Sequence, residues 1–256
     1  MRRALAALAV AGVLAAGCGD STQPAAPAGS GGLSGTVTVF AAASLTESFG
    51  TLGKQFEAAH PGVTVRFNFA ASSALATSIG QGAPADVFAS ASAKTMQTVV
   101  DGGDAANPTT FARNAVEIAV PPDNPAGVTA LADLAKPGLT LALCQEQVPC
   151  GATARTVLDR ARLTVRPVTY GADVKAVLTA VQLGEVDAGI VYRTDVRAAG
   201  AKVRGIEIPA AQNASTSYPI ATLTDAPNEA AAAAFVAYVL SPGGRAVLAG
   251  AGVEGP

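Results

Sequence analysis

Four short turns carry the residues of this chain whose types and positions suggest chemistry. Each lies between a β-rich run and a helical run, and the four are residues 41–44 (AAAS), 70–73 (AASS), 148–151 (VPCG) and 170–174 (YGADV). A helix N-terminus presents free backbone N–H groups, and small side chains let a ligand approach that backbone closely. Since none of the turns contains Lys or Arg, they indicate a compact anion held by neutral donors. Ser44 or Ser72 taken singly is also typical of a helix N-cap.

Two cysteines lie close together in the sequence, with Cys144 at the end of a β-rich run and Cys150 inside one of the turns. The chain has a single histidine, His60, far away in the sequence, so the pair lacks both a further metal ligand and a catalytic base. A disulfide formed outside the cytoplasm is the favoured interpretation. Such a short loop contributes about 2 to 2.5 kcal/mol on the chain-entropy model. Two buried reduced thiols are the alternative.

The composition excludes several functional classes. The chain has 256 residues, 17 Lys+Arg against 19 Asp+Glu, and 50% hydrophobic residues. This hydrophobic content excludes a disordered chain, and the lack of a basic cluster argues against nucleic-acid binding. A single histidine excludes a His-based zinc site. A Ser-His-Asp triad would have to use His60, which lies in a helix-ending turn away from the four turns described above. We therefore expect that the protein is not an enzyme. The alternative is a secreted hydrolase with Ser44 or Ser72 as nucleophile.

The N-terminus has the pattern of a lipoprotein signal peptide at residues 1–17. Arg2 and Arg3 precede an apolar run that ends in small residues before Cys18. Residues 18–35 are dominated by Gly, Pro, Ser, Thr and Ala, which predicts a flexible tether. We expect a lipid on Cys18 and an extracytoplasmic protein anchored at the outer face of the cytoplasmic membrane or in the periplasm. An uncleaved anchor helix is the alternative.

The elements that must position the turns alternate between strand and helix. Strands are expected at residues 36–41, 63–69, 86–89, 115–120, 140–143, 165–169, 188–192 and 218–223. Helices are expected at residues 45–59, 72–80, 93–101, 131–135, 152–161, 174–183, 228–240 and 243–249. This alternation predicts parallel sheets covered by helices on both faces, which bind ligands beyond the carboxyl ends of their strands.

Six segments in order resemble the ModA-type molybdate-binding proteins of ABC importers. They are residues 38–46 (TVFAAASLT), 69–76 (FAASSALA), 82–91 (GAPADVFASA), 148–151 (VPCG), 172–175 (ADVK) and 189–192 (GIVY). The resemblance implies an α/β, two-domain, periplasmic-binding-protein-like fold of type II, each lobe a mostly parallel sheet flanked by helices. We expect lobe 1 at residues 36–114 and 218–256, lobe 2 at residues 115–217, and the ligand in the cleft between them.

The resemblance also implies a ligand set for a tetrahedral oxyanion. It comprises the hydroxyls and amides of Ser44 and Ser72, the backbone amides of Cys150 and Val174, and the Tyr192 hydroxyl. The residues alone leave an alternative for Tyr192, which is that its side chain packs in the core or at a hinge and does not bind the ligand.

Two departures from the family pattern leave this set unchanged. The family often has alanine where Cys150 stands, but only the backbone amide of that residue is thought to bind. An acidic or amide residue often occupies the position of Ser92, which lies outside the ligand set.

The protonation of the ligand explains a site made only of donors. Molybdate at neutral pH is a fully deprotonated dianion whose oxygens only accept hydrogen bonds, whereas phosphate still carries a proton and needs an acceptor. Asp173 is the one carboxylate in the turns; we expect an N-cap there, with an acceptor role toward phosphate as the alternative.

The expected function is capture of molybdate, and of tungstate as well, for an ABC permease. We expect a monomer with no cofactor, in which molybdenum enters only as the bound oxyanion. Selection against sulfate must come from cavity size, because sulfate is also deprotonated. The alternative ligands are another oxyanion or a small organic acid.

Overall fold

The computed structural model describes residues 32–256. The predicted signal peptide at residues 1–17, the predicted lipidation site Cys18 and most of the predicted tether lie outside the described residues. Gly35, predicted as the last tether residue, already belongs to the first strand.

The first half of the sheet has the strand order β2-β1-β3-β9. Its strands are β1 (Gly35–Ala42), β2 (Val63–Ala70), β3 (Val87–Ala89) and β9 (Ser215–Thr222). The first three are parallel, whereas β9 is antiparallel to β3. Side chains alternate between faces along β1, so Val39 packs in one apolar cluster and Phe40 in another.

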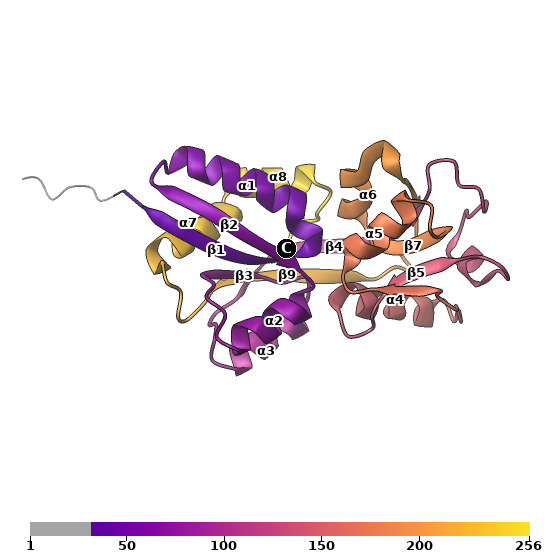
Figure 1. The fold of residues 1–256 in the computed structure, drawn as a ribbon, viewed down its shortest axis with the longest axis horizontal. Helices are drawn as coiled ribbons and strands as arrows, with labels where there is room; N and C mark the ends of the chain where they lie inside the picture. Colours follow the sequence, from indigo (N-terminus) through magenta and orange to yellow (C-terminus); the bar gives the residue numbers. More distant parts are fainter. Residues whose placement is uncertain (1–31) are drawn as a thin grey trace, which may run out of the picture. The chain divides into compact units, whose positions relative to one another are not determined.

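Helices cover both faces of this half (Figure 1). The cluster that contains Val39 packs against α1 (Thr46–Ala59), α7 (Glu229–Leu240) and α8 (Pro242–Gly250). The cluster that contains Phe40 packs against α2 (Ser72–Gly80) and α3 (Ala93–Asp101). Among the described residues, no single helix is long and apolar enough to cross a membrane; α7 and α8 meet that test only as a pair bent by 61°.

The second half is smaller and has one apolar cluster. Its parallel strands are β5 (Leu141–Cys144), β6 (Thr169–Gly171) and β7 (Ala188–Tyr192), with β5 in the centre. Its helices are α4 (Pro149–Arg160), α5 (Val174–Gln182) and α6 (Arg193–Ala199). Three short 3₁₀ segments complete the described chain: η1 (Ala43–Leu45), η2 (Leu131–Ala135) and η3 (Gly200–Lys202).

The long strand β4 (Thr109–Val120) joins the two halves. Its first part pairs with β9, and its last part pairs with β7 and with β8 (Arg204–Glu207), always antiparallel. The chain returns to the first half along β9. The predicted domain boundaries at residues 114/115 and 217/218 fall inside β4 and β9, and the division into domains itself stays a prediction.

The structure departs from the predicted elements in several places. Strands β4 and β9 are antiparallel to their neighbours, so the sheets are mixed. The strand expected at residues 165–169 is displaced to β6, because Pro167 interrupts that run and cannot donate to a ladder. The helix expected at residues 131–135 is 3₁₀, and the one expected at 152–161 begins earlier, at Pro149. The short elements α6 and β8 were not predicted.

Candidate ligand-binding site

A small cavity lies where the two halves meet. Its volume is about 20 Å³, enough for a compact group only. All five predicted ligand residues line it, and the full lining is Ala42, Ala43, Ser44, Ala70, Ala71, Ser72, Ala91, Pro149, Cys150, Asp173, Val174 and Tyr192. Every side chain in this set except Asp173 is neutral, and no lysine or arginine among residues 32–256 lines the cavity.

The first half contributes Ser44 and Ser72. Strands β1 and β2 are paired so that Ala42 lies opposite Ala70, which places the two following turns side by side. Ser44 then lies in η1, and Ser72 is the first residue of α2. The Ser72 hydroxyl oxygen accepts a hydrogen bond from the backbone N–H of Ala91 at 2.9 Å. Because that oxygen accepts, the Ser72 hydroxyl hydrogen is free to donate to a ligand.

The second half contributes two helix N-termini. Helix α4 begins at Pro149, which has no N–H, so Cys150 carries the first backbone donor of that helix. At α5 the Asp173 carboxylate accepts from the backbone N–H groups of Lys175 and Ala176, at 2.9 and 3.0 Å. The predicted N-cap role of Asp173 is therefore confirmed. This cap leaves the N–H of Val174 as the unused donor at the start of the helix.

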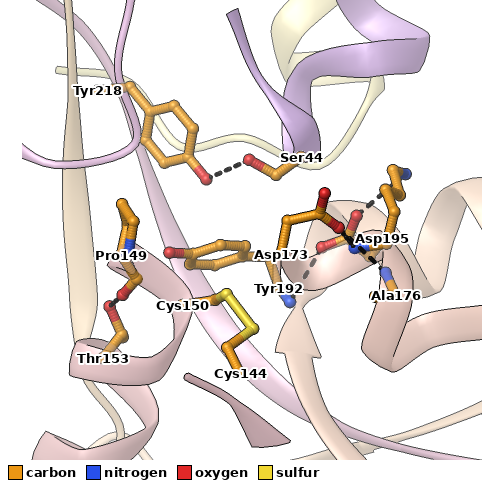
Figure 2. Close-up of a disulfide and its surroundings, with 11 residues drawn as sticks. Ser44, Cys144, Pro149, Cys150, Thr153, Asp173, Ala176, Tyr192, Asp195 and Tyr218 are labelled. Carbon is orange, nitrogen blue, oxygen red and sulfur yellow. Dashed lines mark hydrogen bonds and ion pairs between the residues drawn. A yellow bond between two sulfur atoms is a disulfide. The ribbon is translucent and has the colours of Figure 1, made fainter. Parts of the chain in front are cut away.

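The predicted disulfide between Cys144 and Cys150 is present (Figure 2). It ties the end of β5 to the first turn of α4. The intervening loop folds back so tightly that a Cβ on Gly151 would lie 1.9 Å from the carbonyl oxygen of Gln145. The disulfide and this glycine together fix the position of the Cys150 amide.

Tyr192 ends β7 and brings a phenol to the cavity. The residue is 1% exposed, and its hydroxyl has no hydrogen-bond partner among the described residues. Burial raises the pKa of the Tyr192 phenol above its ordinary value, so the group keeps its proton. A buried hydroxyl without a partner costs free energy. The cavity therefore presents one donor that a ligand oxygen would satisfy.

Three charged side chains beside the cavity are linked by ion pairs. The Lys175 ammonium is 3.0 Å from the Asp195 carboxylate and 2.8 Å from that of Glu47. Asp195 is fully buried, and burial raises its pKa to about 6 against the opposing effect of Lys175. Glu47 lies on α1, so the ion pair with Lys175 connects the two halves. No cluster of His, Cys, Asp and Glu in the described residues is arranged to hold a metal ion.

His60 lies far from the cavity. It follows the last residue of α1, and its ring packs on Phe56 with centroids 4.5 Å apart. Helix α1 has 14 residues, a length of about 21 Å at 1.5 Å per residue, and Ser44 lies before its other end. The chain's single histidine is therefore not placed to activate Ser44.

Two residues near the site were not predicted from the sequence. The hydroxyls of Tyr218 and Ser44 are 2.8 Å apart, and Asn114 donates to Tyr218 across 3.3 Å. Tyr218 is separated from Ser44 by 174 positions, and no local pattern marks such a contact.

Two α/β halves that enclose a small cavity lined by hydroxyls and helix N-termini form the arrangement of a solute-binding protein. The family model for bacterial extracellular solute-binding proteins matches residues 37–254, and the chain belongs to this family.

Individual relatives agree with this assignment. The chain is 40% identical to the molybdate-binding protein ModA of Mycobacterium tuberculosis over 253 residues, covering 98% of this chain and 96% of ModA. The periplasmic molybdate-binding protein of Azotobacter vinelandii has a similar fold, with a TM-score of 0.77 and 22% identity over 86% of this chain and 99% of the other. The sulfate-binding protein SubI of Mycobacterium tuberculosis is also similar, with a TM-score of 0.73 and 19% identity over 86% of both chains. The predicted family resemblance and the periplasmic-binding-protein-like fold are confirmed.

Proposed function

We propose that this protein captures molybdate outside the cytoplasm and delivers it to an ABC import permease. The observation that carries the proposal is a small cavity whose polar lining, apart from the Asp173 carboxylate, consists of donors, including a Tyr192 hydroxyl without a partner among the described residues. A fully deprotonated oxyanion accepts hydrogen bonds at every oxygen and so matches this lining. The relatives named for molybdate binding support the same ligand.

The proposed ligand contacts follow from the geometry. The hydroxyls of Ser44, Ser72 and Tyr192 and the backbone amides of Cys150 and Val174 would each donate to one oxyanion. The two serines belong to the first half and the other three residues to the second. Ligand binding would therefore hold the predicted lobes together, and this closed form is what a permease would recognise.

Tungstate is a second proposed ligand, because it has the same charge and tetrahedral shape as molybdate. The fold alone does not choose among oxyanions, since the similar protein SubI is a sulfate-binding protein. Sulfate is also fully deprotonated, so the size of the closed cavity must exclude it. Hydrogen phosphate matches this set of donors less well, because its proton needs an acceptor. Both backbone hydrogen bonds at the start of α5 end on Oδ1 of Asp173, so the second oxygen of that carboxylate is the one side-chain acceptor that the lining offers.

The remaining proposals rest on the sequence. Arg2, Arg3 and the apolar run before Cys18 support a cleaved signal and a lipid on Cys18. The mature protein would then be a monomer tethered to the outer face of the membrane, close to its permease.

A thermal-shift panel tests the proposed ligand. A ligand at a thousandfold excess over its dissociation constant stabilises the folded state by about 4 kcal/mol, a shift of several degrees in melting temperature. Molybdate and tungstate should produce this shift, whereas sulfate, phosphate and small organic acids should not. An equal shift with phosphate or an organic acid would support the alternative ligands instead.

A further inference from the structure

We propose that Tyr218, supported by Asn114, is a positioning residue that makes the Ser44 hydroxyl an obligatory donor to the bound anion. The inference rests on the proposed function, because it concerns how the same cavity distinguishes a deprotonated oxyanion from a protonated one. Neither Tyr218 nor Asn114 lines the cavity, so both act through Ser44.

The three side chains form a buried chain of hydrogen bonds. The Ser44 and Tyr218 hydroxyl oxygens are 2.8 Å apart, and Figure 2 shows the hydrogen bond that joins them. The Asn114 side-chain amide donates to the Tyr218 oxygen at 3.3 Å and to Thr194 Oγ1 at 2.9 Å. Ser44, Tyr218 and Asn114 are at most 5% exposed. Bulk water therefore does not compete for these bonds.

The hydrogen bonds in this series run in one direction, because the NH₂ group of the Asn114 amide can only donate. The Tyr218 oxygen accepts from Asn114, and the Ser44 oxygen is the one acceptor within hydrogen-bond distance of the Tyr218 hydroxyl among the described residues, so the Tyr218 hydrogen is donated to Ser44. The Ser44 oxygen then accepts, and its own hydrogen is directed to another partner. Ser44 lines the cavity, so that partner is the bound anion. Burial also raises the pKa of Tyr218 well above its ordinary value, so the phenol keeps the proton that it donates.

The backbone fixes the two supporting residues. Asn114 lies on β4 and Tyr218 on β9, and these strands pair with Ala112 opposite Tyr218. Asn114 is two residues further along β4, which places it diagonally across from Tyr218 on the same face. The ring of Tyr218 also packs edge-on against Phe111, with centroids 6.2 Å apart. The orientation of the Tyr218 hydroxyl is therefore set before a ligand arrives.

This direction has a consequence for ligand selection. A serine hydroxyl without Tyr218 can rotate, and it then donates to molybdate or accepts from the proton of hydrogen phosphate or hydrogen arsenate. With Tyr218 in place, Ser44 offers only a donor. A protonated anion then loses the hydrogen bond that its own hydroxyl could have donated to Ser44.

The test compares Tyr218→Phe with the wild-type protein by calorimetric titration at pH 7 with molybdate and with arsenate. The substitution keeps the ring and removes only the hydroxyl. We expect molybdate affinity to fall by about threefold to tenfold and arsenate affinity to stay or rise, so that the selectivity ratio falls. Tyr238→Phe is the matched control, because it removes a hydroxyl that bonds to Gln55 on α1, away from the cavity; its selectivity should equal that of the wild type.

A double-mutant cycle shows whether Tyr218 acts through Ser44. Tyr218→Phe should add no further loss of molybdate affinity in a Ser44→Ala background. An unchanged selectivity ratio, or an equal loss in both backgrounds, would overturn the inference and reduce Tyr218 to a packing residue. If the wild-type protein itself bound no molybdate, the proposed function would be wrong and the inference would fall with it.

Discussion

The Tyr192 hydroxyl should strengthen ligand binding without stabilising the ligand-free fold. It is buried without a partner among the described residues, so the ligand-free fold gains nothing from it. A bond from this donor to a charged oxygen contributes about 1.5 to 3 kcal/mol. Tyr192→Phe should therefore weaken molybdate binding by about tenfold to a hundredfold. The free energy of unfolding without ligand should stay equal or rise.

Calorimetric titration and urea unfolding measure these two quantities separately. The Tyr238→Phe variant, which alters a phenol at the surface of the first half, controls for the loss of any tyrosine hydroxyl. Wild-type affinity in Tyr192→Phe would show that the residue only packs.

Asp195 gives the fold a pH dependence. Burial raises its pKa from an ordinary 3.8 to about 6, so between these values the folded state holds more protons than the unfolded state. The contribution of Asp195 to stability is therefore greatest at about pH 4 and is lost as the pH rises to about 6. A shift of about two units corresponds to about 3 kcal/mol.

The Asp195→Asn variant isolates this contribution because an amide does not titrate. We expect the free energy of unfolding of the wild type, relative to that of the variant, to decrease between pH 4 and pH 7. Urea unfolding at closely spaced pH values measures the difference. Two parallel stability curves would show that Asp195 does not have the raised pKa.

At the scale of an element, the first turn of α4 depends on Gly151. A Cβ at this position would overlap the Gln145 carbonyl oxygen, which belongs to rigid backbone. Gly151→Ala should therefore displace the loop, lower the free energy of unfolding by about 1 to 3 kcal/mol, and weaken molybdate binding through the Cys150 amide.

Gly50→Ala is the matched control for this substitution. Gly50 also lies in a helix, α1, and a Cβ there would have no atom within 4 Å. Alanine should stabilise that helix by up to about 1 kcal/mol. Chemical denaturation of both variants measures the contrast. Equal effects of the two substitutions would contradict the role given to the tight loop.

The sequence predicted those elements whose signals are local. The helix expected at residues 93–101 has the same bounds in the structure, where Ser92 caps it. The antiparallel pairing of β4 and β9 was missed because strand direction depends on partners that are distant in the chain. Likewise, the four turns supply most residues that line the cavity, and the family resemblance added Tyr192. The Asn114–Tyr218–Ser44 chain was missed because it joins residues 104 and 174 positions apart. Such contacts follow from the tertiary fold and leave no periodic pattern.

At the scale of the whole molecule, the Glu47–Lys175 ion pair joins the two halves next to the cavity. Glu47 is about half exposed, so the pair contributes at most about 1 kcal/mol. Glu47→Gln should weaken molybdate binding by up to about fivefold at low salt, and the effect should shrink in high salt because screening already weakens the pair.

The control for this variant is Glu146→Gln, which removes a surface pair with Arg155 within the second half. Titration at low and high ionic strength should show an effect for Glu47 alone. If both variants lost affinity equally, the result would reflect overall charge and not a contact between the halves.

A competition titration tests whether the cavity selects a deprotonated oxyanion of the size of molybdate. Molybdate is titrated calorimetrically into the protein with and without a large excess of phosphate, and again with sulfate. A cavity lined mainly by donors that closes on a deprotonated ion of the right size predicts one molybdate per chain, with an affinity unchanged by either competitor. Displacement of molybdate by phosphate would contradict this selectivity, because the donors of the cavity would then not distinguish a deprotonated oxyanion from a protonated one.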